Sequence, residues 1–239
     1  MEIMYRMSSL LLFPAYIYYI GGFLLAFAIT FLSTPWVTRL AHRIGAVDKP
    51  NNRKVHQKPM PRLGGLAIFI GFALAYLIVM PLNQLSIGLF LGGLIIVILG
   101  ILDDKYELSP KAKLAGQLLA AFTVIGFGLE VEFFNLPFTQ GQWILGWLGI
   151  PITVLWLVGA TNAVNLIDGL DGLAAGVSGI ATAVMLVMAI IMGNIFVALY
   201  SAILLGSILA FLFFNFHPAK IFMGDTGALF LGFNLAALS

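Results

Sequence analysis

Long apolar runs separated by short polar segments fill most of the chain. Seven runs approach the roughly 20 residues that a helix needs to cross a bilayer core of about 30 Å, and they cover residues 16–38, 63–80, 86–102, 114–129, 143–164, 173–192 and 195–214. An eighth run begins near Ala228 and is still apolar at Ser239. The pattern predicts an all-α polytopic membrane protein with seven complete transmembrane helices and the start of an eighth.

We expect residues 1–239 to form a single transmembrane domain. The eighth run covers 12 residues before Ser239, which is too few to cross a bilayer. This predicts a chain that ends inside a helix and is truncated at its C-terminus. The first run has no small-residue cleavage site, so we expect it to be retained as a span rather than removed as a signal peptide.

Composition agrees with a membrane location and excludes several kinds of site. Hydrophobic residues make up 61% of the 239 residues and charged residues only 9%, whereas soluble domains contain about 25% charged residues. The chain has no cysteine, which excludes disulfides, thiolate nucleophiles and cysteine-based metal sites. The formal net charge of +2 is small, and we expect membrane lipid, and no nucleic acid, as a partner.

The connections between the runs differ in charge. Eleven of the twelve Lys and Arg residues lie in odd-numbered connections, and the even-numbered ones carry none. Because positive charge concentrates in cytoplasmic loops, we expect the odd connections in the cytoplasm and the N-terminus outside. Residues 129–142, an even connection, alternate acidic and apolar side chains, which predicts a short extracytoplasmic hairpin or an amphipathic loop.

The acidic side chains gather in polar islands, and every island falls on an odd connection. The islands run from Arg39 to Arg62, Asp103 to Lys113, Asn162 to Asp171 and Asn215 to Asp225. An ionised side chain near a bilayer loses hydration unless a cation or another partner replaces it, so such residues usually mark function. We therefore expect one cytoplasmic pocket that carries out phosphate and metal chemistry.

Two islands hold acids at the ends of apolar runs. Asp103 and Asp104 are adjacent, and adjacent carboxylates repel unless a proton or cation lies between them. This favours a base or a metal ligand, and a solvated pair at a helix end is the alternative. Asp225 lies at the start of the last apolar run, where it would either cap the helix or coordinate a cation.

In the third island a polar residue recurs at every third position. These residues are Asn162, Asn165, Asp168 and Asp171. Residues three apart adjoin one another on a helix, and the glycines that follow the two acids can unwind it. Oxygen ligands of this kind suit a hard divalent cation. A polar turn between two helices is the simpler alternative.

The first and fourth islands suggest contacts to a phosphate and to a flat ring. Attraction to anionic lipid alone would explain the cations of the first island, but its prolines hold His56 and Lys58 next to two glycines, which favours an organised site. We expect His56 to donate a hydrogen bond to phosphate rather than to bind a metal. Phe222 would either stack on a base or anchor the chain at the membrane interface.

Together these motifs resemble the polyprenyl-phosphate N-acetylhexosamine-1-phosphate transferases of glycosyltransferase family 4. The resemblance covers essentially the whole chain and rests on Lys54 to Lys58 with Gly64 and Gly65, Asp103 and Asp104, Asn162 to Gly172, and Phe222 to Asp225. It implies a multi-pass enzyme of the bacterial plasma membrane that transfers a sugar 1-phosphate from a UDP-sugar to undecaprenyl phosphate. UMP is released, and Mg²⁺ or Mn²⁺ is the cofactor.

The resemblance also implies a branch of the family. Residues 51–56 and 106–110 look more like the branch that uses UDP-N-acetylglucosamine for teichoic acid or O-antigen synthesis. The peptidoglycan branch, which uses UDP-MurNAc-pentapeptide, is the alternative. The family carries a further histidine-rich motif towards its C-terminus that this sequence does not reach, so we expect a protein ending at Ser239 to be inactive. The sequence leaves a homodimer open.

By match to the family's motifs, each candidate residue has an expected role. The catalytic set is Asp103, Asp104 and Asp168, with Asp103 as base or nucleophile, and Asp225 and Asn165 match metal ligands. Phosphate contacts are expected from Lys58, His56 and Lys113, and uridine contacts from Asp171, Asn215 and Phe222. Because an acceptor phosphate with a second pKa of about 6 is largely dianionic near neutrality, we expect direct in-line attack rather than an aspartyl-phosphate intermediate.

Two other classes of membrane protein are alternatives. An intramembrane prenyltransferase would also use Asp-rich motifs and Mg²⁺, but the segment from Phe222 to Asp225 has no role in it. A cation-coupled transporter would need acids in the middle of its spans, whereas every acid here lies at the end of a run or in a loop. The transferase is therefore the preferred interpretation.

Overall fold

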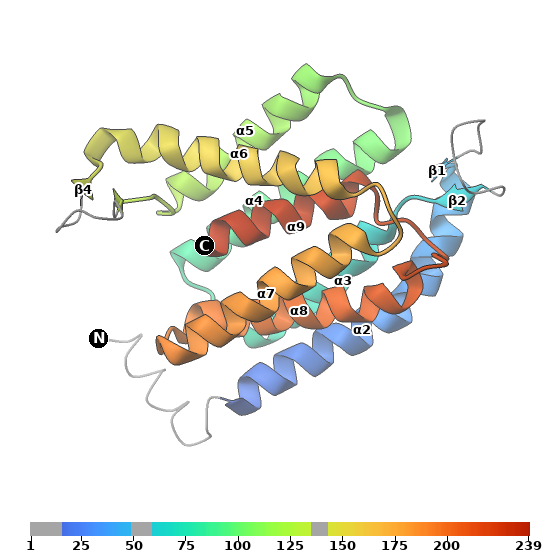
Figure 1. The fold of residues 1–239 in the computed structure, drawn as a ribbon, viewed down its shortest axis with the longest axis horizontal. Coiled ribbons are helices and arrows are strands. Elements are labelled where there is room, and N and C mark those ends of the chain that lie inside the picture. The colour runs from blue at the N-terminus through green and yellow to red at the C-terminus, as the bar shows by residue number, and fades with distance from the viewer. Residues whose placement is uncertain (1–15, 49–58, 135–142) are drawn as a thin grey trace.

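The computed structural model describes residues 16–48, 59–134 and 143–239, and within them the chain is mainly helical (Figure 1). The helices are α2 (Tyr16–Ile44), α3 (Gly64–Val79), α4 (Gln84–Tyr106), α5 (Pro110–Gly126), α6 (Gly149–Ile167), α7 (Leu173–Ile191), α8 (Ile195–Asn215) and α9 (Gly224–Leu238). Two hairpins, β1 (Val47–Asp48) with β2 (Met60–Pro61) and β3 (Phe133–Phe134) with β4 (Trp143–Ile144), and the short 3-10 helix η1 (Gly146–Leu148) complete the described elements.

Each predicted apolar run coincides with one helix. By length and composition, five helical segments of the described residues could cross a membrane. They are α2, α4, η1 with α6, α7 and α8, and α3 is a shorter apolar helix. The prediction of a polytopic helical membrane protein is confirmed at this level. The number of crossings and their orientation stay predictions.

Several predicted boundaries differ from the structure, and the two largest differences are six residues each. The run predicted at 143–164 begins its α-helix only at Gly149, because residues 143–148 form β4 and η1. The first run, predicted to end at residue 38, continues as α2 to Ile44. Its last turn contains His42 and Arg43, and basic side chains at a helix C-terminus interact favourably with the helix dipole. Hydropathy alone cannot detect this polar extension.

The outer surface of the bundle is strongly apolar. Leu32, Ile78 and Leu155, on three different helices, expose 73%, 69% and 74% of their surface. In water a surface of this kind would promote association, whereas in a bilayer the hydrocarbon chains cover it and the helices satisfy their own backbone hydrogen bonds. The exposed side chains therefore fit a lipid environment.

Helix α9 lies in the interior, where it packs against α4, α6 and α3 (Figure 1). Glycines let the neighbouring helices approach its first turn at backbone distance. A Cβ atom added to Gly65 of α3 would lie 1.9 Å from the amide nitrogen of Gly227, and one added to Gly100 of α4 would lie 2.3 Å from Cα of Thr226. Small residues of this kind are typical of close helix contacts in membranes. The packing fixes the position of Asp225, which lies in this first turn.

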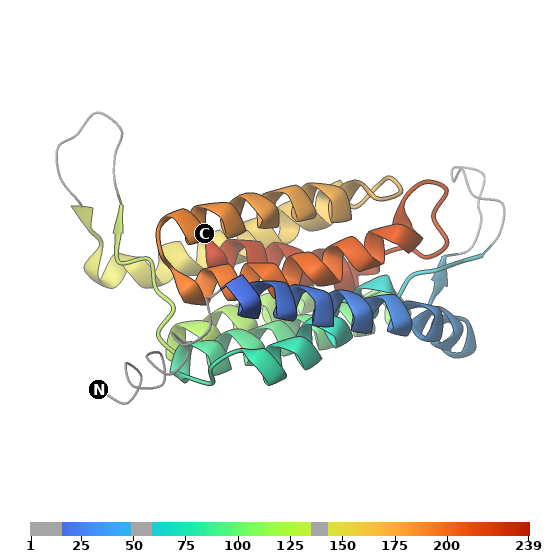
Figure 2. The same cartoon turned by 90° about the horizontal axis from the view of Figure 1, so that it is seen from below.

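The polar islands come together at one end of the bundle. Figures 1 and 2 place β1–β2 and the connections α4–α5, α6–α7 and α8–α9 at this end, and the β3–β4 hairpin at the opposite end. The second hairpin is antiparallel and pairs Phe133 with Ile144. A short strand pair therefore flanks this connection, for which the sequence predicts a hairpin or an amphipathic loop. The two ends of the molecule thus differ in chemistry as the charge pattern predicts.

Candidate active site

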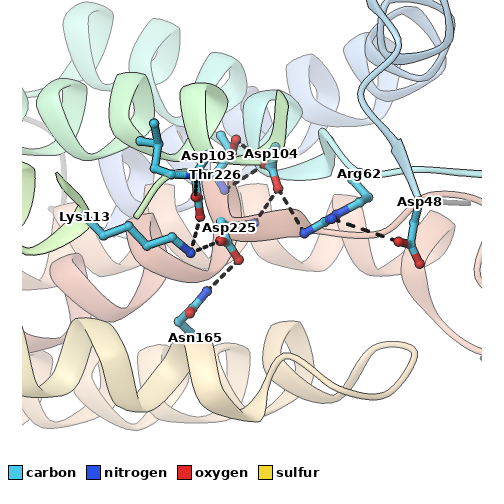
Figure 3. Close-up of polar contacts among 9 residues, drawn as sticks. Asp48, Arg62, Asp103, Asp104, Lys113, Asn165, Asp225 and Thr226 are labelled. Atoms are coloured by element: carbon cyan, nitrogen blue, oxygen red, sulfur yellow. Dashed lines mark hydrogen bonds and ion pairs between the residues drawn. The ribbon is translucent and has the colours of Figure 1, made fainter. Parts of the chain in front are cut away.

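Asp225 connects three helices at the polar end (Figure 3). Its Oδ2 accepts a hydrogen bond of 2.7 Å from Nζ of Lys113 on α5, and its Oδ1 accepts one of 2.8 Å from Nδ2 of Asn165 on α6. These partners lie 112 and 60 residues away along the chain. The second, third and fourth islands therefore meet at one carboxylate.

Asp103 lies on the other side of Lys113. Its Oδ2 forms an ion pair with Nζ of Lys113, and its Oδ1 accepts a hydrogen bond of 2.8 Å from the backbone N–H of Leu108. The Lys113 ammonium thus lies between the carboxylates of Asp103 and Asp225 and offsets their repulsion. Asp103 is 3% exposed, so a solvated acid pair at the helix end is excluded.

Asp104 points towards α9 instead. Its Oδ1 accepts the backbone N–H of Asp225 at 2.9 Å, and its Oδ2 accepts the backbone N–H of Thr226 at 3.0 Å and the Thr226 hydroxyl at 2.6 Å. The first N–H groups of a helix have no partner within the helix. A carboxylate at this end also interacts favourably with the helix dipole. Asp104 is therefore the residue that caps α9, which leaves the Asp225 side chain directed towards Lys113 and Asn165.

A tight turn between α4 and α5 positions Lys113. Glu107 ends α4 in the left-handed conformation with φ 51°, and Ser109 caps α5 by accepting the backbone N–H of Ala112 at 3.3 Å. Pro110 occupies the first turn of α5, where its missing N–H has no cost. The turn returns the chain so that Lys113 reaches back to Asp103.

The polar residues of the third island have separate partners. Asn162 exchanges hydrogen bonds of 2.7 and 3.3 Å with the amide of Gln117, a buried residue of α5. Asn165 binds Asp225 as described. Helix α6 ends at Ile167, so Asp168 and Asp171 lie in the turn that follows, where Gly172 adopts φ 72°. The prediction from the spacing, that neighbouring polar residues of this island adjoin on a helix, therefore holds for Asn162 and Asn165 only.

Asp168 adds a further carboxyl group to the centre. Burial, reinforced by the neighbouring charges of Asp225 and Asp104, raises the pKa of Asp168 to about 7, and the Arg62 guanidinium acts in the opposite direction. Its backbone N–H donates to the carbonyl of Asn165 at 3.3 Å. The structure thus brings Asp103, Asp104, Asp168 and Asp225 into one region, as the sequence predicts.

The remaining predicted contacts lie in and around the α8–α9 loop. Asp171 accepts the backbone N–H of Ala219 at 3.0 Å and lies 3.0 Å from Nδ1 of His217, which joins the α6–α7 turn to this loop. Asn215 is buried and donates to the carbonyl of Ile221 at 3.0 Å, so it closes the loop on itself. The half-buried Phe222 donates its backbone N–H to Pro61 O at 2.8 Å. His217 was not among the predicted residues.

A small polar cavity opens beside the carboxylates. It has a volume of about 170 Å³ and is lined by Arg62, Asp103, Glu107, Leu108, Lys113 and Asp225. Ligand sites for whole small molecules usually measure about 300–1,000 Å³, so the cavity suits a phosphate group rather than a complete nucleotide sugar. Arg62 was not predicted, although it directly precedes the segment with the glycine pair. His56 and Lys58, which were predicted, lie outside the described residues.

The donor chemistry at this end fits a hard divalent cation. Within the described ranges no three Asp, Glu or His side chains form a group that could hold a metal ion. Mg²⁺, however, is usually held by one or two carboxylates together with water and substrate phosphates, and the available donors are all oxygens. Asp225 could provide a carboxylate, Asn165 an amide oxygen and Asp168 a second carboxylate.

The fold and the site define a class of protein: a polytopic α-helical membrane protein with a carboxylate–lysine centre at one end of its bundle. The sequence profile described as "Glycosyl transferase family 4" matches residues 86–239. The chain belongs to this family, and the resemblance noted in its motifs is thereby confirmed.

Named relatives agree with the family. A "probable undecaprenyl-phosphate N-acetylglucosaminyl 1-phosphate transferase" of Bacillus subtilis is 50% identical over 219 residues, which are 91% of this chain and 61% of the relative. A "decaprenyl-phosphate N-acetylglucosaminephosphotransferase" of Mycolicibacterium smegmatis is 39% identical over 236 residues, 90% of this chain and 58% of the relative. A "phospho-N-acetylmuramoyl-pentapeptide-transferase" of Halalkalibacterium halodurans is 37% identical over 236 residues, 90% of this chain and 72% of the relative. The chain thus spans about three fifths of the first two.

Proposed function

We propose that the protein transfers N-acetylglucosamine 1-phosphate from UDP-N-acetylglucosamine to undecaprenyl phosphate. This step would start a lipid-linked glycan of the cell envelope, of the teichoic acid or O-antigen type. The observation that carries the proposal is the centre of Asp103, Lys113 and Asp225 at one end of an apolar bundle. The names of the B. subtilis and M. smegmatis relatives support the acceptor class and the sugar, and that of H. halodurans supports the peptidoglycan branch as the alternative.

In the proposed reaction, an oxygen of the lipid phosphate attacks the phosphorus atom that carries the sugar. A new P–O bond forms between the two phosphates, and the bond from that phosphorus to the bridging oxygen breaks, so that UMP leaves with the electron pair. The reacting groups are all anionic, and catalysis of phosphoryl transfer depends mainly on positioning and charge neutralisation. Lys113, held between Asp103 and Asp225, is placed to neutralise this charge.

We propose that Asp225 and Asn165 hold Mg²⁺ or Mn²⁺, which would neutralise charge on the diphosphate of the donor. Asp103 is paired with Lys113 and with the Leu108 N–H, and this supports a role in orienting Lys113. The acceptor phosphate is largely dianionic near neutrality because its second pKa is about 6. Both points favour direct in-line attack over a covalent intermediate on Asp103. Phosphorylated Asp103 trapped with the UDP-sugar alone would overturn this preference.

Substrate specificity is tested with the full-length protein in detergent or vesicles. We expect UMP release when undecaprenyl phosphate is combined with UDP-N-acetylglucosamine, and none when it is combined with UDP-MurNAc-pentapeptide. A chelator should remove the activity, and Mg²⁺ should restore it. Release with the pentapeptide substrate alone would assign the protein to the peptidoglycan branch. Inhibition by isoprenyl diphosphates, without inhibition by uridine nucleotides, would favour the prenyltransferase alternative.

We also propose that the polar end faces the cytoplasm of a bacterial cell and that the N-terminus lies outside. The support is the concentration of eleven of the twelve Lys and Arg residues in odd connections, together with the positive-inside rule. The single-cysteine variants Lys105→Cys and Trp143→Cys, at exposed positions near opposite ends of the bundle, test the orientation. In intact cells, an impermeant thiol reagent should label the Trp143→Cys variant and leave the Lys105→Cys variant unlabelled. The reverse pattern would invert the topology.

A further inference from the structure

We propose that Arg62 is a second cation of this site, and that its guanidinium binds phosphate oxygens of the donor or of the acceptor opposite Lys113. The proposal rests on the proposed transferase function. It concerns a residue between β2 and α3 that is separate from the cations predicted from the sequence, Lys58 and Lys113.

The backbone around Arg62 is fixed from two sides. Its own N–H donates to the carbonyl of Ala46 at 3.1 Å, beyond the end of α2. Residues 61, 64 and 65 form backbone hydrogen bonds of 2.8, 3.0 and 2.8 Å with Phe222 and Met223. A basic segment that only attracts anionic lipid does not need a fixed backbone. The structure around Arg62 is that of a positioned side chain.

Gly224 allows this segment to approach the carboxylates. Its φ is 72°, a conformation that favours glycine. A Cβ atom at this position would lie 2.0 Å from the carbonyl oxygen of Arg62 and 2.7 Å from Oδ1 of Asp104. Arg62 and Asp104 therefore both lie against Gly224, and the absence of a side chain at this residue makes room for them. Figure 3 shows their side chains next to Asp225.

The guanidinium of Arg62 is attracted to carboxylates without being held by short bonds. Its Nη1 lies 4.0 Å from Oδ1 of Asp48, and its Nη2 lies 3.8 Å from Oδ1 of Asp104, whereas charged N–H···O hydrogen bonds measure about 2.7–2.9 Å. Asp104 directs its oxygens to the N-terminus of α9. Lys113, by contrast, forms a hydrogen bond of 2.7 Å to Asp225. Of the two described cations that line the cavity, Arg62 has the donors that a ligand can recruit.

The negative charge of the cavity makes a second cation favourable for phosphate binding. The acidic residues that line the cavity, Asp103, Glu107 and Asp225, carry more negative charge than Lys113 offsets, so a phosphate that enters meets repulsion. The Arg62 side chain is 28% exposed and lines the same cavity as Lys113. A guanidinium is always charged and presents a planar fork of N–H groups that matches two phosphate oxygens. A phosphate bound between Arg62 and Lys113 would have a cation on each side.

The alternative is that Arg62 only ties the β1–β2 hairpin to α4 through Asp48 and Asp104. The two roles differ in what they change. A purely structural ion pair would change the melting temperature and leave substrate affinity unchanged. A phosphate contact affects the KM of the substrate that carries the phosphate.

The test compares Arg62→Gln and Arg62→Lys with the wild-type full-length protein. Lys105→Gln is the matched control, because it removes one cation at the same end of the bundle, from an exposed side chain next to Tyr106. The measurements are the KM values for UDP-N-acetylglucosamine and undecaprenyl phosphate, equilibrium binding of UDP and of uridine, and the melting temperature.

We expect Arg62→Gln to raise the KM of one substrate about tenfold or more, because hydrogen bonds to charged groups contribute about 1.5–3 kcal/mol. Arg62→Lys should restore only part of the affinity, since an ammonium cannot bind two oxygens in the same plane. Weaker UDP binding with unchanged uridine binding would identify the donor diphosphate, and a higher KM for the lipid alone would identify the acceptor phosphate. Lys105→Gln should stay within about twofold of the wild type.

Unchanged KM values and unchanged UDP binding in Arg62→Gln, with or without a lower melting temperature, would overturn the proposal and leave Arg62 as a structural residue. This outcome is distinct from failure of the proposed function. If the wild-type protein neither releases UMP nor binds UDP, the transferase assignment itself fails, and the role of Arg62 in phosphate binding fails with it.

Discussion

Asp225→Asn is expected to lower the rate of UMP release by about a thousandfold or more while the protein stays folded in the membrane. The substitution keeps the size of the side chain and removes its charge. Asp225 is the shared acceptor of Lys113 and Asn165, so the loss affects the position of the lysine and, under the proposal, the binding of the metal. Loss of one preorganised charged contact in a phosphoryl-transfer site costs about 4 kcal/mol, which is about a thousandfold in rate.

The measurement is a UMP-release assay with both substrates saturating, run alongside size-exclusion chromatography and thermal unfolding. Glu132→Gln is the matched control, because it makes the same change of acid to amide at an exposed position near the opposite end of the bundle. It should keep activity within about twofold of the wild type. An Asp225→Asn protein that retains more than a tenth of wild-type activity would show that this carboxylate is not central to the reaction.

The arrangement of the helices could be predicted because a bilayer imposes it. Spanning segments must be helical and apolar over a set length, and each predicted run therefore coincides with a helix. Boundaries failed where the chain leaves the apolar region: residues 143–148 are hydrophobic yet form a strand and a 3-10 helix, and the end of α2 is basic yet helical.

The partners within the site could not be predicted from the sequence. Successive residues of a helix point about 100° apart, so Asp103 and Asp104 must face different neighbours, but which of them meets Lys113 and which meets α9 depends on how α4 packs. Arg62 and Gln117 were missed for a related reason. Gln117 lies within an apolar run and pairs with Asn162, 45 residues away, and no local pattern indicates such a contact.

The role of Asp104 could not be predicted from its residue type and position in the sequence alone. Adjacent acids at the end of an apolar run favour a base or a metal ligand, and the resemblance to the family implies that Asp104 belongs to the catalytic set. In the structure its carboxylate accepts the backbone N–H groups of Asp225 and Thr226 and the hydroxyl of Thr226. The geometry supports a positioning role in which Asp104 acts through Asp225.

Asp104→Ala is accordingly expected to lower both stability and activity. It removes the cap of α9, which costs about 1–2 kcal/mol of stability, and it leaves the donors at Asp225 and Thr226 without their acceptor. A shift of about 1 Å at a reacting centre costs about a hundredfold in rate, so we expect the turnover number to fall by at least that factor. Thermal unfolding and the UMP-release assay measure the two effects.

Asp104→Asn separates positioning from direct chemistry. An amide keeps one of the two acceptor oxygens that bind the N-terminus of α9, so a positioning role predicts a smaller loss of stability than in Asp104→Ala and activity within about tenfold of the wild type. The KM for Mg²⁺ is a third readout, since a displaced Asp225 would weaken the metal's binding in Asp104→Ala more than in Asp104→Asn. A variant Asp104→Asn that is as stable as the wild type yet as inactive as Asp104→Ala would show that the negative charge of Asp104 is itself required. In that case Asp104 would itself be a catalytic carboxylate, and its contacts with α9 would hold Asp104 in place rather than position Asp225.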